Sequence, residues 1–206
     1  YKDSNLKNIT ADENFDTFSL SWYNDTDVDP ATGLTPYINM QKVLKVCHDF
    51  VDNFDNTFSN LLFIGQTGVG KTFLSNCIAR ALMDSCHSII YLTAGEFFDS
   101  FKSNDFKEFG SSKFDTSFFV ECDLLIIDDL GTEKASDYNF SNLFNTINER
   151  LLRRKSIIIS SNLEMPDIET RYSQRIFSRL VSAYSILRLF GDDIRCMKKL
   201  SPTKRS

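Results

Sequence analysis

The sequence predicts an α/β fold, in which a central parallel sheet of five strands carries helices on both faces. Short apolar runs, such as residues 61–64 and 124–127, alternate with longer stretches in which apolar residues recur at three- and four-residue steps. The short runs are typical of strands, and the longer pattern marks one face of a helix. Strands that alternate with helices in this way indicate a parallel sheet covered on both sides.

The expected elements follow one another along a single domain. Residues 1–36 are polar with a few aromatics and form an N-terminal lead-in, and residues 199–206 form a basic tail. The folded domain spans 37–198 and begins with a helix from residue 38 to about residue 56. Its expected strands are 61–64, 89–92, 124–127, 157–160 and a last one near 185–190. Its other expected helices are 71–83, 94–102, 114–120 and 138–152.

The composition excludes several other classes of protein. The 206 residues are 42% hydrophobic and 25% charged, which allows an ordinary core. The five cysteines include no Cys-x-x-Cys pair and only two histidines accompany them, so we expect a cytoplasmic protein without disulfides or zinc. No apolar run approaches the roughly 18 residues that cross a bilayer, so we expect no membrane contact. The net charge of −5 confines any nucleic-acid contact to a local patch.

A glycine-rich loop follows the first predicted strand and opens the next predicted helix. Its residues are Gly65, Gln66, Thr67, Gly68, Val69, Gly70, Lys71 and Thr72. Glycines let backbone N–H groups turn towards phosphate oxygens, and the start of the helix adds a favourable dipole. We expect Lys71 to reach the β- and γ-phosphates and Thr72 to ligate Mg²⁺. The loop therefore predicts a P-loop that binds ATP or ADP with Mg²⁺.

Two acids, Asp128 and Asp129, follow the predicted strand 124–127. Asp128 is placed to hold Mg²⁺ through water, and Asp129 to orient or deprotonate the attacking water. Apolar residues followed by an acid are also common in purely structural strands, but the P-loop upstream favours the functional interpretation. A pair of acids favours hydrolysis by water over phosphoryl transfer to a small molecule.

Four further polar residues are candidates because of their positions. Asn162 follows the predicted strand 157–160, where its amide could bind the γ-phosphate and the lytic water or simply form a turn. Arg175 and Arg179 share one helical face and could enter the site of a neighbouring subunit or remain surface residues. Arg195 could reach the phosphates of its own subunit or pair with one of the two aspartates before it.

Together these residues resemble the AAA+ module of bacterial DnaC/DnaI-type replicative helicase loaders, a branch of the P-loop NTPases. The resemblance covers most of residues 10–198 and rests on five motifs: Gly65–Thr72, Asp128–Thr132, Ser160–Asn162, Arg175-x3-Arg179 and Gly191–Arg195. It implies, in that order, Walker A, Walker B, sensor 1, arginine finger and sensor 2 roles. It also implies ATP-dependent self-association into an oligomer or filament, assembly on single-stranded DNA and delivery of the hexameric replicative helicase.

Other activities fit parts of the same pattern. An IstB-like helper ATPase of DNA transposition shares these motifs. Many AAA+ proteins carry a glutamate where this chain has the shorter Asp129, so we expect slow, partner-stimulated ATP hydrolysis or a nucleotide switch with little turnover. A small-molecule kinase would need an arginine-rich lid, and residues 94–117 contain no arginine.

Two features could contact DNA, and each has an ordinary structural alternative. The basic run 150–155 ends a predicted helix, where positive charge also favours the helix dipole. Six phenylalanines could stack on bases, but their three- and four-residue spacing favours packing in the core. They are Phe97, Phe98, Phe101, Phe106, Phe109 and Phe114.

Overall fold

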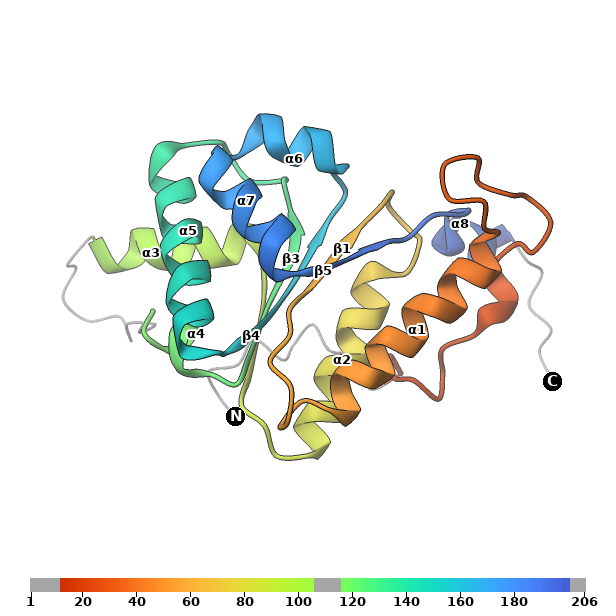
Figure 1. Cartoon of the computed structure of the whole chain (residues 1–206), viewed down its shortest axis with the longest axis horizontal. Helices are drawn as coiled ribbons and strands as arrows, with labels where there is room; N and C mark the ends of the chain where they lie inside the picture. The colour runs from red at the N-terminus through yellow and green to blue at the C-terminus, as the bar shows by residue number, and fades with distance from the viewer. Residues whose placement is uncertain (1–11, 106–115, 201–206) are drawn as a thin grey trace.

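Five parallel strands form one sheet, as the sequence predicted, and their spatial order is β2-β3-β4-β1-β5 (Figure 1). The computed structural model describes residues 12–105 and 116–200. The strands are β1 (Leu61–Ile64), β2 (Ile89–Thr93), β3 (Leu124–Leu130), β4 (Ser156–Ser161) and β5 (Ser185–Arg188). Strand β1 lies between β4 and the edge strand β5, so its carboxyl end is flanked by the ends of both.

Eight α-helices and one short 3-10 helix accompany the sheet in the described residues. They are η2 (Leu20–Trp22), α1 (Pro36–Asp52), α2 (Lys71–Asp84), α3 (Ala94–Asp105), α4 (Phe118–Glu121), α5 (Asp137–Arg153), α6 (Met165–Arg171), α7 (Gln174–Ala183) and α8 (Ile194–Leu200). None of these helices is long and apolar enough to cross a membrane.

Helix α1 differs from its prediction at both ends. Its cap is Thr35, whose hydroxyl accepts a hydrogen bond from the N–H of Ile38 at 3.2 Å, and Pro36 occupies the first turn. The expected start at Ile38 was wrong because the apolar periodicity begins after the capping residues. The helix ends at Asp52, where Asn53 forms the C-cap, so the apolar Phe54 lies in a turn beyond it.

Two other predicted segments differ in extent, and two short helices were not predicted. The predicted helix 114–120 reduces to the short α4, and residues 114 and 115 lie outside the described part of the chain. Helices α6 and α8 had no predicted counterpart because each has only seven residues, too few for a clear period. Helix α8 includes the first two residues of the expected basic tail, and 201–206 lie outside the described residues.

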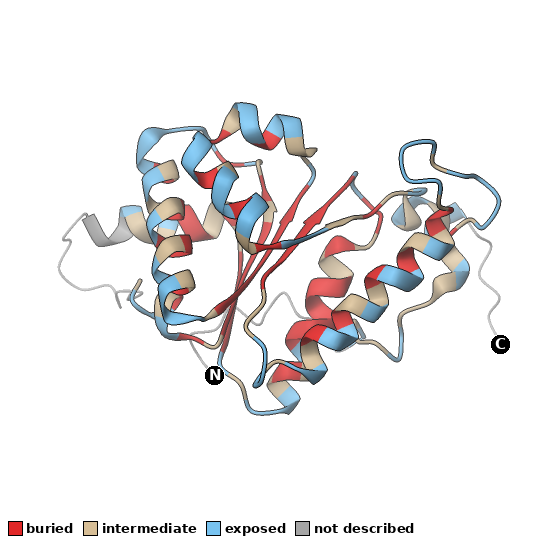
Figure 2. Cartoon of the chain, viewed as in Figure 1, coloured by how far each residue is buried: buried red, intermediate tan, exposed pale blue. Residues whose placement is uncertain are grey.

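The sheet separates two hydrophobic cores. Alternate residues of β1 pack into the two cores. Leu62 and Ile64 face the core under α3, α5, α6 and α7. Leu61 and Phe63 face the core under α1 and α2. Figure 1 shows these two helical layers on opposite sides of the sheet, and Figure 2 shows that β1 to β4 are buried along nearly their whole length, whereas the edge strand β5 is partly exposed. Aromatic residues of the lead-in, among them Phe15, Phe18, Trp22 and Tyr23, pack against the second core.

The phenylalanines of α3 belong to the core and not to a base-stacking surface. Phe97 and Phe98 are buried, and Phe97 packs against Phe98, Phe101 and Phe119 with ring centroids 5.1 to 5.2 Å apart. The core-packing interpretation is therefore confirmed for Phe97 and Phe98. The other members of that series, Phe106, Phe109 and Phe114, lie outside the described residues.

The basic run at the end of α5 is not an open cationic patch. Arg150 is fully buried, and its guanidinium donates to the backbone carbonyls of Phe119, Cys122, Asp123 and Ser156. It thereby ties α4 and the starts of β3 and β4 together. Two further cations of the run are paired: Arg153 with Glu121 and Glu149, and Lys155 with Asp123 at 2.7 Å. The interpretation of 150–155 as a DNA-contacting patch was wrong for Arg150, because its burial depends on segments distant in sequence.

Candidate functional site

The P-loop joins β1 to α2 at the carboxyl edge of the sheet, and its shape requires glycine. Gly65 has a φ of 142°, and a Cβ there would lie 2.0 Å from the carbonyl oxygen of Leu189. Gly70 has a φ of 104°, and a Cβ there would lie 2.6 Å from the hydroxyl of Tyr23. Only glycine combines these φ angles with so close an approach. The hydroxyl of Tyr23 also donates to the carbonyl of Val69 at 3.1 Å, so the lead-in supports the loop directly.

Lys71 lies at the centre of the site and is almost fully buried, with 5% of its surface exposed. Its Nζ donates to the carbonyls of Gly65 and Gln66 and to Oδ1 of Asn162, each at 2.7 Å. Burial lowers the pKa of Lys71, and the nearby Asp129 opposes this effect. The ammonium group therefore links the P-loop to the residue after β4, in the position from which it can reach phosphate oxygens.

Both carboxylate oxygens of Asp128 accept hydrogen bonds from hydroxyl groups. Oδ2 accepts from Thr72 at 3.0 Å and from Tyr91 at 2.8 Å, and Oδ1 accepts from Ser160. These donors come from α2, β2 and β4, which surround the end of β3. The oxygens of Thr72 and Asp128 suit Mg²⁺, which binds through one or two protein oxygens, water and substrate phosphates. The predicted metal-holding pair therefore lies together and has the donor chemistry of such a site.

Tyr91 and Ser160 were absent from the predicted set of site residues. Their side chains lie on strands next to β3, and nothing local in the sequence indicates that they reach Asp128. The one available signal is that a polar group adjoins the apolar run of each strand, Tyr91 after Ile89 and Ile90 in β2, and Ser160 after residues 157–159 in β4. The pKa of the Tyr91 hydroxyl is raised by burial and by the charge of Asp128, so the phenol remains a proton donor.

Asp129 has an unusual backbone conformation for a non-glycine residue. A β-bulge between Ile127 and Leu130 interrupts the pairing of β3 with β4, and Asp129 within it has a φ of 57°. The N–H of Asp129 donates to the hydroxyl of Ser160 at 2.9 Å, which holds the bulge in place. Left-handed geometry costs a residue of this type about 1 to 2 kcal/mol, and such strain is typical of functional sites.

The carboxylate of Asp129 lies among the charged groups of the site. Its Oδ1 accepts a hydrogen bond from the side-chain amide of Asn162 at 3.3 Å. Burial raises the pKa of Asp129, and the charge of Asp128 raises it further, whereas Lys71 and Arg195 lower it. Asn162 therefore bridges Lys71 and Asp129, as expected for a residue at the same edge of the sheet.

Arg195 lies near the same charges but is exposed to solvent. Its positive charge contributes to lowering the pKa of both Lys71 and Asp129. The start of α8 contacts the P-loop, because the N–H of Ile194 donates to the carbonyl of Gly68 at 3.1 Å. Asp193 is one of the two aspartates with which the Arg195 side chain could pair. Its Oδ1 accepts hydrogen bonds from the backbone N–H groups of Arg195 and Cys196, and so it caps α8.

Arg175 and Arg179 are not brought to this site within the chain. Both are exposed on α7, and Nε of Arg179 donates to Oδ1 of Asn148 on α5 at 2.8 Å. Figure 1 shows α7 on the opposite side of the sheet from α2, which carries Lys71. The two arginines are therefore available to a second molecule and do not complete their own nucleotide site.

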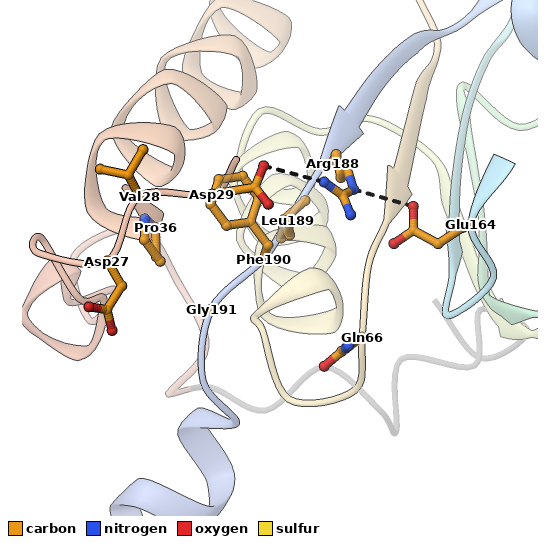
Figure 3. A pocket seen from close by; sticks show the side chains of 10 residues that line it. All are labelled: Asp27, Val28, Asp29, Pro36, Gln66, Glu164, Arg188, Leu189, Phe190 and Gly191. Carbon is orange, nitrogen blue, oxygen red and sulfur yellow. Dashed lines mark hydrogen bonds and ion pairs between the residues drawn. The ribbon is translucent and has the colours of Figure 1, made fainter. Parts of the chain in front are cut away.

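A pocket of about 320 Å³ opens beside the P-loop (Figure 3). It is lined by Asp27, Val28, Asp29, Pro36, Gln66, Glu164, Arg188, Leu189, Phe190 and Gly191. The lead-in forms one wall, and the P-loop and the segment after β5 form the others. Arg188 crosses the pocket between Asp29 at 3.6 Å and Glu164 at 3.3 Å.

The chemistry of this pocket suits a flat ring with N–H donors. Pro36, Leu189 and Phe190 supply apolar surface, while the carboxylates of Asp27 and Asp29 are hydrogen-bond acceptors. The sequence did not predict these residues, because the lead-in and the segment after β5 meet only in the folded chain.

Comparisons with known proteins agree with this geometry. A family model described as IstB-like ATP binding protein matches residues 34–201. The replicative helicase loader DnaC of Escherichia coli (strain K12) is 22% identical over 151 residues, which are 73% of this chain and 61% of that protein. This chain thus spans about three fifths of the length of that curated relative.

Solved structures show the same fold. The crystal structure of DnaI matches with a TM-score of 0.66 and 22% identity, over 92% of this chain and 93% of that one. AMPPCP-bound DnaA from Aquifex aeolicus matches with a TM-score of 0.69 and 17% identity, over 96% of this chain and 58% of that one. These likenesses confirm the predicted P-loop fold of the AAA+ type.

Proposed function

We propose that this chain, which belongs to the IstB-like ATP binding protein family, is an ATPase that loads a replicative helicase during DNA replication. The observation that carries the proposal is the convergence of Lys71, Thr72, Asp128, Asp129 and Asn162 at one edge of the sheet. Each has the chemistry that phosphoryl transfer to water requires. The resemblance to DnaC, a replicative helicase loader, supplies the biological setting.

ATP binding follows from the loop geometry. The phosphates lie against the backbone N–H groups of residues 65–72, and Lys71 exchanges its two carbonyl acceptors for phosphate oxygens. Thr72 and Asp128 hold Mg²⁺, which neutralises charge on the phosphate oxygens when it is bound. The adenine occupies the pocket beside the loop, where Asp27 or Asp29 accepts a hydrogen bond from its amino group.

Hydrolysis requires a water molecule in line with the γ-phosphate. Asp129 accepts a hydrogen bond from that water, and Asn162, already hydrogen-bonded to Asp129 and Lys71, contacts both the water and the γ-phosphate. Because the aspartate side chain is one methylene shorter than glutamate, turnover is slow and depends on a partner that completes the site.

A second copy of the chain supplies that completion. Arg179, assisted by Arg175, enters the neighbour's site and stabilises charge on the γ-phosphate, while Arg195 contacts the phosphates of its own subunit. The exposure of both α7 arginines, away from the site of their own subunit, supports this arrangement. The result is an ATP-bridged oligomer or filament, which acts on single-stranded DNA.

Affinity purification from cell extract, together with an ATP-turnover assay, tests the loader function. ATP-dependent co-purification of the full-length protein with a replicative helicase is the expected result, and loss of the complex in the Lys71→Ala variant is the control. Co-purification with a transposase instead would favour a helper ATPase of transposition, which the family description also fits. Tight binding of ATP without turnover in the presence of the helicase and DNA would indicate a nucleotide switch.

A further inference from the structure

We infer that Tyr91 is a positioning residue for nucleotide-bound Mg²⁺, because its hydroxyl fixes the carboxylate of Asp128. This inference rests on the proposed ATPase function. Tyr91 lies in β2, next to the strand that carries Asp128, and its hydroxyl donates to Oδ2 of that residue at 2.8 Å. The side chain is 1% exposed, so its position is set by packing and not by solvent.

The ring of Tyr91 packs in the core as a phenylalanine ring would, and the hydroxyl is its one polar group. Strand β2 is otherwise apolar over Ile89, Ile90 and Leu92, and the ring of Tyr91 belongs to the core under α1 and α2. Burying a phenol hydroxyl in such a core costs free energy unless it finds a partner. Within the described residues, the hydrogen bond that this hydroxyl makes is to Asp128.

The three hydroxyls around Asp128 have different freedom to move. Thr72 is itself a proposed metal ligand, so its oxygen must face the cation when nucleotide binds. Ser160 also accepts the N–H of Asp129 and therefore serves both acids. Tyr91 serves Asp128 alone and is held by a rigid, buried ring. Tyr91 is thus the donor that keeps Oδ2 oriented when Thr72 turns its hydroxyl to the cation.

Loss of the Tyr91 hydroxyl is therefore expected to weaken the binding of Mg²⁺ and to leave the binding of the nucleotide itself unchanged. Without the hydroxyl, the carboxylate of Asp128 loses a hydrogen bond and can rotate away from the orientation that holds a metal-bound water. The phosphate contacts of Lys71 and of the loop N–H groups remain. Tyr91→Phe should therefore weaken Mg²⁺ binding to the ATP-loaded protein by roughly 10- to 150-fold, as expected for one charge-assisted hydrogen bond.

The test compares Tyr91→Phe with Tyr184→Phe. Tyr184 is also buried, but its hydroxyl has no hydrogen-bond partner among the described residues, so its removal controls for loss of a buried phenol oxygen. Binding of a fluorescent ATP analogue is titrated with Mg²⁺ for the parent and both variants, and circular dichroism checks that each is folded. We expect unchanged affinity in EDTA, a roughly 10- to 150-fold higher half-saturating Mg²⁺ concentration for Tyr91→Phe alone, and a lower kcat at unchanged KM for ATP.

A double-mutant cycle with Asp128→Asn distinguishes positioning from a general loss of stability. If Tyr91 acts through Asp128, Tyr91→Phe has no further effect on Mg²⁺ binding in the Asp128→Asn background. Coincident Mg²⁺ titrations for the parent and Tyr91→Phe would overturn the inference while leaving the ATPase proposal intact. Absence of Mg²⁺-dependent nucleotide binding by the parent protein would instead overturn the proposed function.

Discussion

Replacing Ser160 by alanine is expected to impair both acids of the site at once. The Ser160 hydroxyl donates to Oδ1 of Asp128 and accepts the N–H of Asp129 at 2.9 Å, so a single oxygen links the proposed metal-holding carboxylate to the strained bulge. Loss of the bond to the carboxylate is worth about 1.5 to 3 kcal/mol, because hydrogen bonds to charged groups are stronger than neutral ones. Loss of the bond from the N–H of Asp129 adds about 1 kcal/mol, as expected for a hydrogen bond between neutral groups.

The neighbouring Ser161 provides a matched control. It is equally buried, and its hydroxyl donates to the carbonyl of Leu130 at 2.6 Å without contacting either acid. In urea unfolding, Ser161→Ala should lose about 1 to 2 kcal/mol of stability, and Ser160→Ala about 2.5 to 4 kcal/mol because one of its bonds is to a carboxylate. Only Ser160→Ala should lower kcat for ATP hydrolysis, by up to roughly 70- to 900-fold if the whole of the lost interaction, about 2.5 to 4 kcal/mol, is needed in the transition state. An equal loss of kcat in the two variants would refute the assignment of Ser160 to the acids.

Two further predictions concern the neighbour's contribution and the fold. Arg179→Ala should bind ATP normally but lose assembly-dependent turnover, and mixing it with an active-site variant should restore activity if the arginine acts in trans; equal activity of Arg179→Ala and the parent would exclude that role. Burial raises the pKa of Asp123, but hydrogen bonds from Lys155 and Ser88 lower it by more, to about 2. The ionised carboxylate of Asp123 therefore stabilises the folded state fully above pH ~4, and this contribution is lost as the pH falls towards 2. Because Asp123 is 34% exposed, we expect the contribution to the free energy of unfolding to be about 1 kcal/mol. Urea unfolding of Asp123→Asn should show this deficit at pH 7 and none near pH 2; a deficit independent of pH would contradict the ion-pair explanation.

The parts of the fold that the sequence predicted are those with a local cause. The P-loop is readable because its glycines, Lys71 and Thr72 are adjacent in the chain and follow an apolar strand. The acids at 128 and 129 were found in the same way. The structure adds the bulge at Asp129, which no residue pattern indicates, because it arises from the pairing of β3 with β4.

The parts that it did not predict depend on contacts between distant segments. Arg150 belongs to a basic run, yet it is buried because α4 and the starts of β3 and β4 offer it four carbonyl oxygens. Tyr91 looks like any core aromatic until β2 is aligned with β3. The pocket beside the P-loop joins the lead-in to the segment after β5, two regions more than 150 residues apart. The periodicity and spacing of residues along the sequence indicate none of these three contacts.

Nucleotide titration of the parent protein and the Lys71→Ala variant tests the central claim most directly. Lys71 is the group that joins the P-loop carbonyls to Asn162, and removal of its ammonium leaves the phosphates without their main cation. With Mg²⁺ present, the account predicts saturable ATP binding by the parent and none by Lys71→Ala, with both proteins folded by circular dichroism. Retention of the parent's ATP affinity by the folded variant would contradict it.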